Sequence, residues 1–199
     1  ERDGIIDMVR ARYATAVVAN SNAVSKSLAT VVGAEKHVDV IYNGFDLEAV
    51  SKVKPLDLGK EFGLPAGPVV VCVGRFTRCK AFEDLIAACG ILQRRNVDVS
   101  LLLVGESVPE ENDYEKSLKD IAARERVRNV VFAGWRNDVP AIMKAATVFV
   151  LPSRREAFGR VVVEAWASGL PVVVADGGGP AELVRDGVDG LLVTGGDTN

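Results

Sequence analysis

The chain has few of the residues on which metal and nucleic-acid sites depend. It contains one histidine, His37, and three cysteines, Cys72, Cys79 and Cys89, without Cys-x-x-Cys spacing, so we expect no bound metal. Cys72 and Cys89 fall in apolar segments, which predicts packed, reduced thiols and a cytoplasmic protein. A net charge of −3 argues against a general nucleic-acid binder, and no apolar run is long enough to span a membrane.

Short apolar runs alternate with segments of helical spacing from Val69 onward. Continuous apolar strands, each followed by a helix, predict an α/β fold with a parallel sheet covered on both faces. The expected strands are 69–73, 101–104, 130–133, 148–151, 172–175 and 191–193, and the expected helices are 82–94, 114–124, 139–146, 157–168 and 181–184.

The first 68 residues are organised differently. Strand candidates at 16–19 and 38–41 flank a helix that ends near Val32, and Tyr42-Asn43-Gly44 is a strong turn signal. Residues 52–68 are charged and carry three prolines, as a connector does. We therefore expect the end of an earlier unit and an interdomain segment in 1–45, a connector in 46–68 and the main domain in 69–199.

Two glutamates eight positions apart, Glu156 and Glu164, follow the fourth expected strand of the main domain. They bracket the first turns of a helix that is expected to begin near Ala157 or Phe158. Free N–H groups at such a helix start, together with the permissive backbone of Gly159, suit a phosphate at the carboxyl end of a strand. Glu164 would accept hydrogen bonds from a diol and Glu156 from a second polyol. The alternative is that Glu156 only caps the helix and Glu164 is a solvated surface residue.

Two cations follow the first strand of the main domain, in the segment from Gly74 to Lys80. Gly74 frees the turn, while Arg75 and Lys80 provide a fork and a point charge for a diphosphate. The segment has neither the Walker pattern nor Gly-x-Gly-x-x-Gly, which disfavours a nicotinamide site. A solvated basic turn is the alternative.

Glycines also follow the other strands. Gly105 and Gly134 predict sharp connections on the same edge of the sheet, and Trp135 either stacks on a base or sugar or simply packs. The run Gly177-Gly178-Gly179 predicts a backbone-lined concavity, and Glu182 then lies in a first helical turn, where a carboxylate also favours the helix dipole. Together these groups predict a crevice for a phosphorylated, polyhydroxylated ligand.

Five ordered motifs resemble the retaining nucleotide-sugar glycosyltransferases of family 4, which have the GT-B fold. The resemblance covers essentially the whole chain and implies the C-terminal, Rossmann-like half of that fold, truncated at its C-terminus, with 69–199 as the donor-binding domain. The motifs are Glu156 to Glu164 (E-x7-E), Gly74-Arg75-Phe76 followed by Lys80, and the segments 40–46, 164–173 and 178–182.

The resemblance implies a role for each motif residue. Arg75 and Lys80 would neutralise the departing diphosphate, Glu164 would hold the ribose hydroxyls, and Glu156 would contact the donor sugar near the reacting centre. These cations replace a metal, so no metal or other cofactor is implied, and a hexosyl group would be transferred with retention. The implied donor-binding residues are Gly74, Arg75, Lys80, Gly134, Glu156, Phe158, Gly159 and Glu164.

The chain departs from the family pattern in the donor loops. Ala81 stands where a glycine usually follows the phosphate lysine, Cys79 replaces an acidic residue, and the stretch from Val104 to Ser107 lacks the frequent second glycine. The missing N-terminal domain would bind the acceptor, a glycan, lipid or small molecule, so we expect this fragment to bind donor weakly and to be inactive alone. The parent protein would act in glycan or lipopolysaccharide biosynthesis. Peripheral binding of the full-length protein to the inner membrane is an alternative to a purely cytoplasmic location.

Two other interpretations remain at this stage. A nucleotide-sugar epimerase of related fold would need acid/base carboxylates or a histidine, and His37 lies outside the crevice motifs. A non-catalytic nucleotide-binding module would have no need of the four charged residues Arg75, Lys80, Glu156 and Glu164. Donor-dependent sugar transfer by the full-length protein distinguishes a glycosyltransferase from both of these alternatives.

Overall fold

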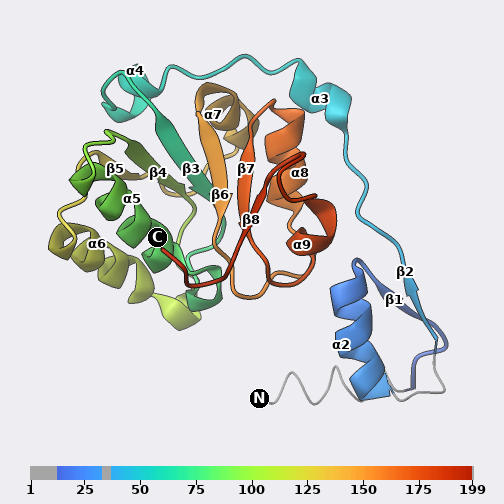
Figure 1. Ribbon diagram of the computed structural model, residues 1–199. Coiled ribbons are helices and arrows are strands. Elements are labelled where there is room, and N and C mark those ends of the chain that lie inside the picture. The colour runs from blue at the N-terminus through green and yellow to red at the C-terminus, as the bar shows by residue number, and fades with distance from the viewer. Residues whose placement is uncertain (1–12, 33–36, 199) are drawn as a thin grey trace.

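The computed structural model describes residues 13–32 and 37–198 (Figure 1). The main strands are β3 (Val69–Val73), β4 (Ser100–Val104), β5 (Val130–Phe132), β6 (Val148–Leu151), β7 (Val172–Ala175) and β8 (Leu191–Val193). The helical segments among them are η1 (Arg78–Lys80), α5 (Phe82–Arg94), η2 (Pro109–Glu111), α6 (Tyr114–Arg124), α7 (Val139–Ala145), α8 (Arg160–Ala167) and α9 (Pro180–Leu183). Before them come β1 (Val17–Ala19), α2 (Asn22–Val32), β2 (Val38–Val40), α3 (Leu47–Ser51) and α4 (Leu58–Phe62).

The main sheet has six parallel strands in the order β5-β4-β3-β6-β7-β8, which confirms the predicted α/β fold. A separate parallel pair, β1 and β2, forms with α2 a small unit beside α9 (Figure 1). No helix among the described residues is long and apolar enough to cross a membrane.

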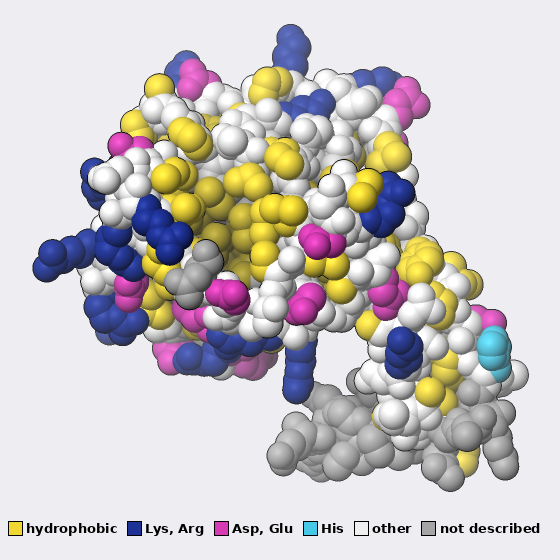
Figure 2. Space-filling view, viewed as in Figure 1, with side chains coloured by type: hydrophobic (Ala, Val, Ile, Leu, Met, Phe, Trp, Pro, Cys, Tyr) yellow, Lys and Arg dark blue, Asp and Glu magenta, His cyan; other side chains and the backbone are white. Residues whose placement is uncertain are grey.

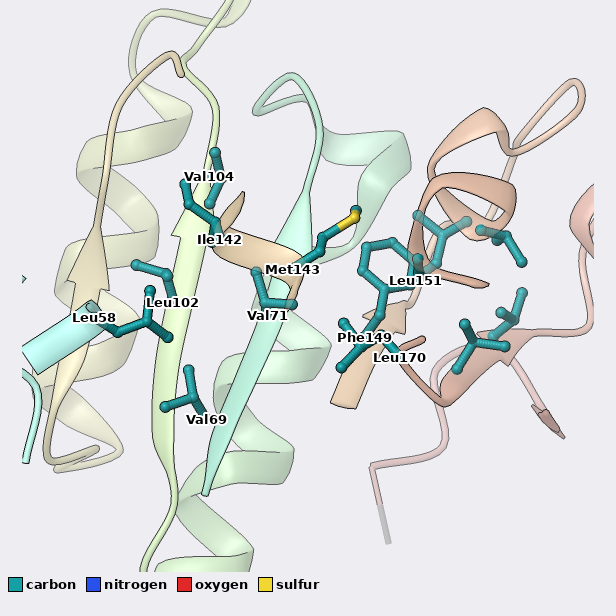
Figure 3. Close-up of a cluster of buried hydrophobic side chains, with 14 of the residues drawn as sticks. Leu58, Val69, Val71, Leu102, Val104, Ile142, Met143, Phe149, Leu151 and Leu170 are labelled. Atoms are coloured by element: carbon teal, nitrogen blue, oxygen red, sulfur yellow. The ribbon is translucent and has the colours of Figure 1, made fainter. Parts of the chain in front are cut away.

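Side chains on both faces of the sheet are buried. On one face α5 and α6 cover the half of the sheet formed by β3, β4 and β5, where Cys72 and Leu103 pack. On the other face α7 and α8 pack on Val71, Phe149 and Leu151 (Figure 3). The prediction of packed thiols is confirmed, because the Cys72 and Cys89 side chains are buried. Burial raises the pKa of both thiols to about 12. Cys79 is exposed.

Most predicted elements match the structure within one residue, but the helix expected from 157 is wrong at its start. α8 begins at Arg160, because Gly159 has φ 86° and a residue in that left-handed region cannot continue a right-handed helix. The segment 46–68 contains α3 and α4, each capped by the aspartate before it.

The strand order places a topological switch point between β3 and β6. The chain leaves β3 toward β4 and leaves β6 in the opposite direction, toward β7. The two connections separate at this point, so a crevice opens outside the carboxyl ends of these strands, where open α/β sheets bind ligands.

Candidate functional site

The loop after β3 and the loop after β6 are tied together at the switch point. The Arg154 N–H donates to the Cys79 carbonyl at 2.9 Å. One residue beyond Cys79, the Lys80 ammonium forms an ion pair with the Glu156 carboxylate, and the two side chains are only 18% and 16% exposed. The predicted phosphate cation and the predicted sugar carboxylate therefore neutralise each other in this structure.

A pocket of about 210 Å³ lies around this ion pair and brings five predicted site residues together. They are Gly74, Lys80, Glu156, Phe158 and Gly159. Three polar residues that sequence reasoning had not assigned to the site also line the pocket: Asn20, Asn43 and Arg160. Asn43 was recognised as a turn residue within the motif at 40–46, without a role in the site, and nothing in the local sequence assigned Asn20 or the Arg160 side chain to it.

Unpaired backbone N–H groups line one wall of this pocket. Within the described part of the chain, the N–H groups of Phe158, Gly159 and Arg160 have no hydrogen-bond acceptor. A side chain at position 159 would require an unfavourable φ, and its Cβ would lie 2.7 Å from Cγ of Pro180. Gly159 thus sets a backbone geometry in which these donors can bind an anion.

A backbone-lined concavity is expected at the run of three glycines after β7, but none of the three lines the pocket around Lys80 and Glu156. A Cβ on Gly178 would lie 2.4 Å from the Glu156 carbonyl, and one on Gly179 would lie 2.2 Å from the Ala157 carbonyl. The Gly179 N–H also donates to the Glu156 carbonyl at 2.9 Å. The run instead packs against the loop after β6 and holds the backbone of Glu156.

A second pocket, of about 450 Å³, lies outside the carboxyl ends of β3, β4 and β5 and shares Gly74 with the first. Arg75, Trp135 and Arg136 line it. Trp135 is 67% exposed, so it is available for stacking and does not pack in the core. Asp138 and Glu61 both bind the Arg136 guanidinium, whereas the Arg75 side chain forms no ion pair with any described residue.

Close backbone contacts join the loops beneath this second pocket. The Gly105 N–H donates to the Gly134 carbonyl at 2.9 Å, and a Cβ on Gly105 would lie 1.9 Å from the Gly74 carbonyl oxygen. Gly105 therefore permits the approach of two strand ends that a larger residue would force apart. Gly134, with φ 69°, lines neither pocket.

Glu164 lies apart from the other predicted site residues. Its side chain is 27% exposed on α8, its Oε1 is 3.9 Å from Nε of Arg160, and it lines neither pocket. Of the two glutamates of the motif, only Glu156 lines the smaller pocket.

A third cavity, of about 310 Å³, is an apolar groove on the face of β6, β7 and β8 beside α5, visible as the yellow hollow in Figure 2. It lies on the face of the sheet and extends to the residues that follow β8, and its lining is largely aliphatic. A charged, hydroxylated ligand would lose its hydration there without replacement. Among the described residues, no three His, Cys, Asp or Glu side chains are placed to hold a metal ion.

The chain is similar to known glycosyltransferases over most of its length. Residues 67–199 match the family model described as "Glycosyl transferases group 1". The lipopolysaccharide core biosynthesis glycosyltransferase LpsE of Rhizobium meliloti is 33% identical over 94% of this chain and 51% of its own length. The alpha-maltose-1-phosphate synthase of Mycobacterium tuberculosis is 36% identical over 90% of this chain and 48% of its own.

A crystal structure of Anabaena Alr3699/HepE in complex with UDP and glucose superimposes with a TM-score of 0.85. It is 36% identical, and the match covers 95% of this chain and 52% of that protein. The chain thus spans about half the length of these relatives.

Proposed function

The chain belongs to the group 1 glycosyl transferases, and we propose that it is the donor-binding half of an enzyme that transfers a sugar from a nucleoside diphosphate sugar. The transfer retains the anomeric configuration. One observation carries the proposal: two pockets meet at Gly74 outside the carboxyl ends of the strands, and each is lined by a predicted phosphate-binding cation. The similarity to a protein whose crystal structure contains UDP and glucose supports it.

The two pockets suit the two ends of such a donor. The nucleoside occupies the larger pocket, where the exposed face of Trp135 is available to a base. The diphosphate lies at the shared boundary, between Arg75, Lys80 and the free N–H groups before α8. The sugar extends into the smaller pocket toward Glu156. Glu164 holds the ribose hydroxyls, an assignment that rests on the family motif.

The site stabilises charge that develops as the donor breaks. Negative charge builds on the diphosphate when its bond to the sugar cleaves. The positive charges of Arg75 and Lys80 and the Gly159 N–H stabilise this charge. Binding of a phosphate draws Lys80 away from Glu156, which leaves that carboxylate free to contact the sugar. These cations do the work of a divalent ion, so we propose transfer without a metal.

The acceptor, a glycan, lipid or small molecule, binds to the part of the parent protein that lies outside this chain. We therefore propose that the 199-residue chain binds the donor and transfers little sugar alone. The whole protein would act in glycan or lipopolysaccharide biosynthesis, as the name of LpsE states for that relative.

Isothermal titration of the chain with UDP, GDP and ADP, beside Lys80→Ala, tests the donor site. We expect one nucleotide to bind saturably and Lys80→Ala to weaken it at least about tenfold, because a charge-assisted contact to phosphate is lost. Absence of binding in a chain that circular dichroism shows to be folded, or equal binding by the variant, would refute the proposal. Epimer formation from the sugar nucleotide without acceptor would favour an epimerase instead.

A further inference from the structure

Glu182, on α9, binds the N-terminus of a helix 160 residues earlier in the chain. Its carboxylate accepts hydrogen bonds from the Asn22 N–H at 2.8 Å, from the Asn22 side-chain amide at 3.0 Å and from the Ala23 N–H. These bonds lower the pKa of Glu182 against the opposing effect of desolvation. A carboxylate from the main domain thus caps α2, which belongs to the N-terminal unit.

Two further contacts lie beside this cap. The Ser21 hydroxyl donates to the Ala157 carbonyl at 2.6 Å while it accepts the Val24 N–H at 3.1 Å. The Phe158 ring lies against residues that follow β2, with its centroid 5.9 Å from that of Tyr42 and 6.1 Å from that of Phe45. The N-terminal unit is therefore attached to the same loop that carries Glu156.

The attachment determines the wall of one pocket but not of the other. Asn20, which follows β1, and Asn43, which follows β2, line the smaller pocket together with Lys80 and Glu156. No residue before Val73 lines the larger pocket. Movement of the N-terminal unit would therefore open the smaller pocket and leave the larger one unchanged.

We propose that Glu182 is a positioning residue, which fixes the N-terminal unit on the donor domain and so closes the sugar end of the site. This inference rests on the proposed function, because it assumes that the sugar of the donor occupies the smaller pocket. Its consequence is selective: loss of the cap weakens the binding of a nucleotide sugar but not of the free nucleoside diphosphate.

The test compares two ligands on the Glu182→Gln variant. Glutamine keeps the shape of the side chain but turns an amide N–H₂ toward N–H donors, so at least one bond to α2 is lost. We expect the variant to bind UDP-glucose about tenfold more weakly than the wild-type chain and to bind UDP equally well. GDP and ADP with their glucose conjugates are titrated in parallel, so the outcome does not depend on the base.

Two other variants make the result specific. Ser21→Ala removes the neighbouring hydrogen bond from Ser21 to the Ala157 carbonyl. We expect it to change the ratio of the affinities for UDP-glucose and UDP in the same direction as Glu182→Gln. Asp120→Asn, an exposed residue on α6, removes an equal charge and should leave the ratio unchanged. Thermal unfolding of every variant shows that the donor domain is intact.

Equal weakening of both ligands by Glu182→Gln, or no change in either, would overturn the positioning role and leave the proposed function standing. A wild-type chain that binds none of the nucleotides or their glucose conjugates would contradict the proposed function, and the positioning role would fail with it.

Discussion

Replacement of Glu156 by glutamine should increase the affinity of the chain for a free nucleoside diphosphate, although Glu156 is assigned to the site. In the structure the Glu156 carboxylate forms an ion pair with the Lys80 ammonium, the same group that is proposed to bind a phosphate. Binding of a diphosphate must therefore break or share this ion pair, and it brings a second anion close to the carboxylate. Glu156→Gln removes both obstacles while it preserves the size of the side chain.

The magnitude follows from the separation of the charges. Two like charges about 4 Å apart repel by about 4 kcal/mol at an effective dielectric constant of about 20. Lys80 and Glu156 retain some exposure, at 18% and 16%, and the released lysine regains part of its hydration, so only a fraction of this repulsion persists. We expect a gain of about 1–2 kcal/mol, which corresponds to roughly 5–30-fold tighter binding.

Isothermal titration with UDP, GDP and ADP measures this effect without interference from a sugar contact. Glu164→Gln is the comparison variant, because it makes the same charge change at the other glutamate of the motif, which forms no ion pair with Lys80. If Glu164 holds the ribose, its replacement weakens binding, so the two variants should change the affinity in opposite directions. Weaker nucleotide binding by Glu156→Gln would refute the proposed competition for Lys80.

Two further predictions concern the backbone and the thiols of the same domain. Gly159→Ala should lower the free energy of unfolding by about 3 kcal/mol in urea titrations, because it combines a left-handed φ with a steric clash. Gly169→Ala, at a position with φ 77° and open space, should lower it by about 1 kcal/mol. Equal losses in the two variants would contradict the clash at position 159. A thiol reagent at pH 8 should modify the exposed Cys79 quickly. It should modify Cys72 and Cys89 only after unfolding, since burial raises the pKa of these two thiols to about 12. Fast reaction of all three cysteines in the folded protein would contradict the packing.

The architecture could be predicted because its signals are local. Short, valine-rich apolar runs such as Val69 to Val73 and Val172 to Ala175 favour strands of a sheet buried on both faces, and both were placed with their observed bounds. The start of α8 could not be placed in this way, because the steric demand on Gly159 comes from Pro180, twenty-one residues later.

The site was only partly accessible from sequence for the same physical reason. Lys80 and Glu156 were recognised through their motifs, but their ion pair depends on which loops meet at the switch point. Asn20 and Asn43 reach the pocket only because the N-terminal unit packs on the main domain, and Glu182 contributes to that packing from a remote position. Interactions between distant segments carry no local pattern.

The central claim is that a nucleoside diphosphate binds at the switch point, and backbone NMR of the 21.2 kDa chain tests it most directly. On addition of the nucleotide that binds, we predict that the amide signals of Gly74, Phe158 and Gly159 shift in a saturable manner. Those of Ala88 and Val193, which line the apolar groove, should stay in place. Saturable shifts confined to the groove, with the switch-point amides unchanged, would contradict the account.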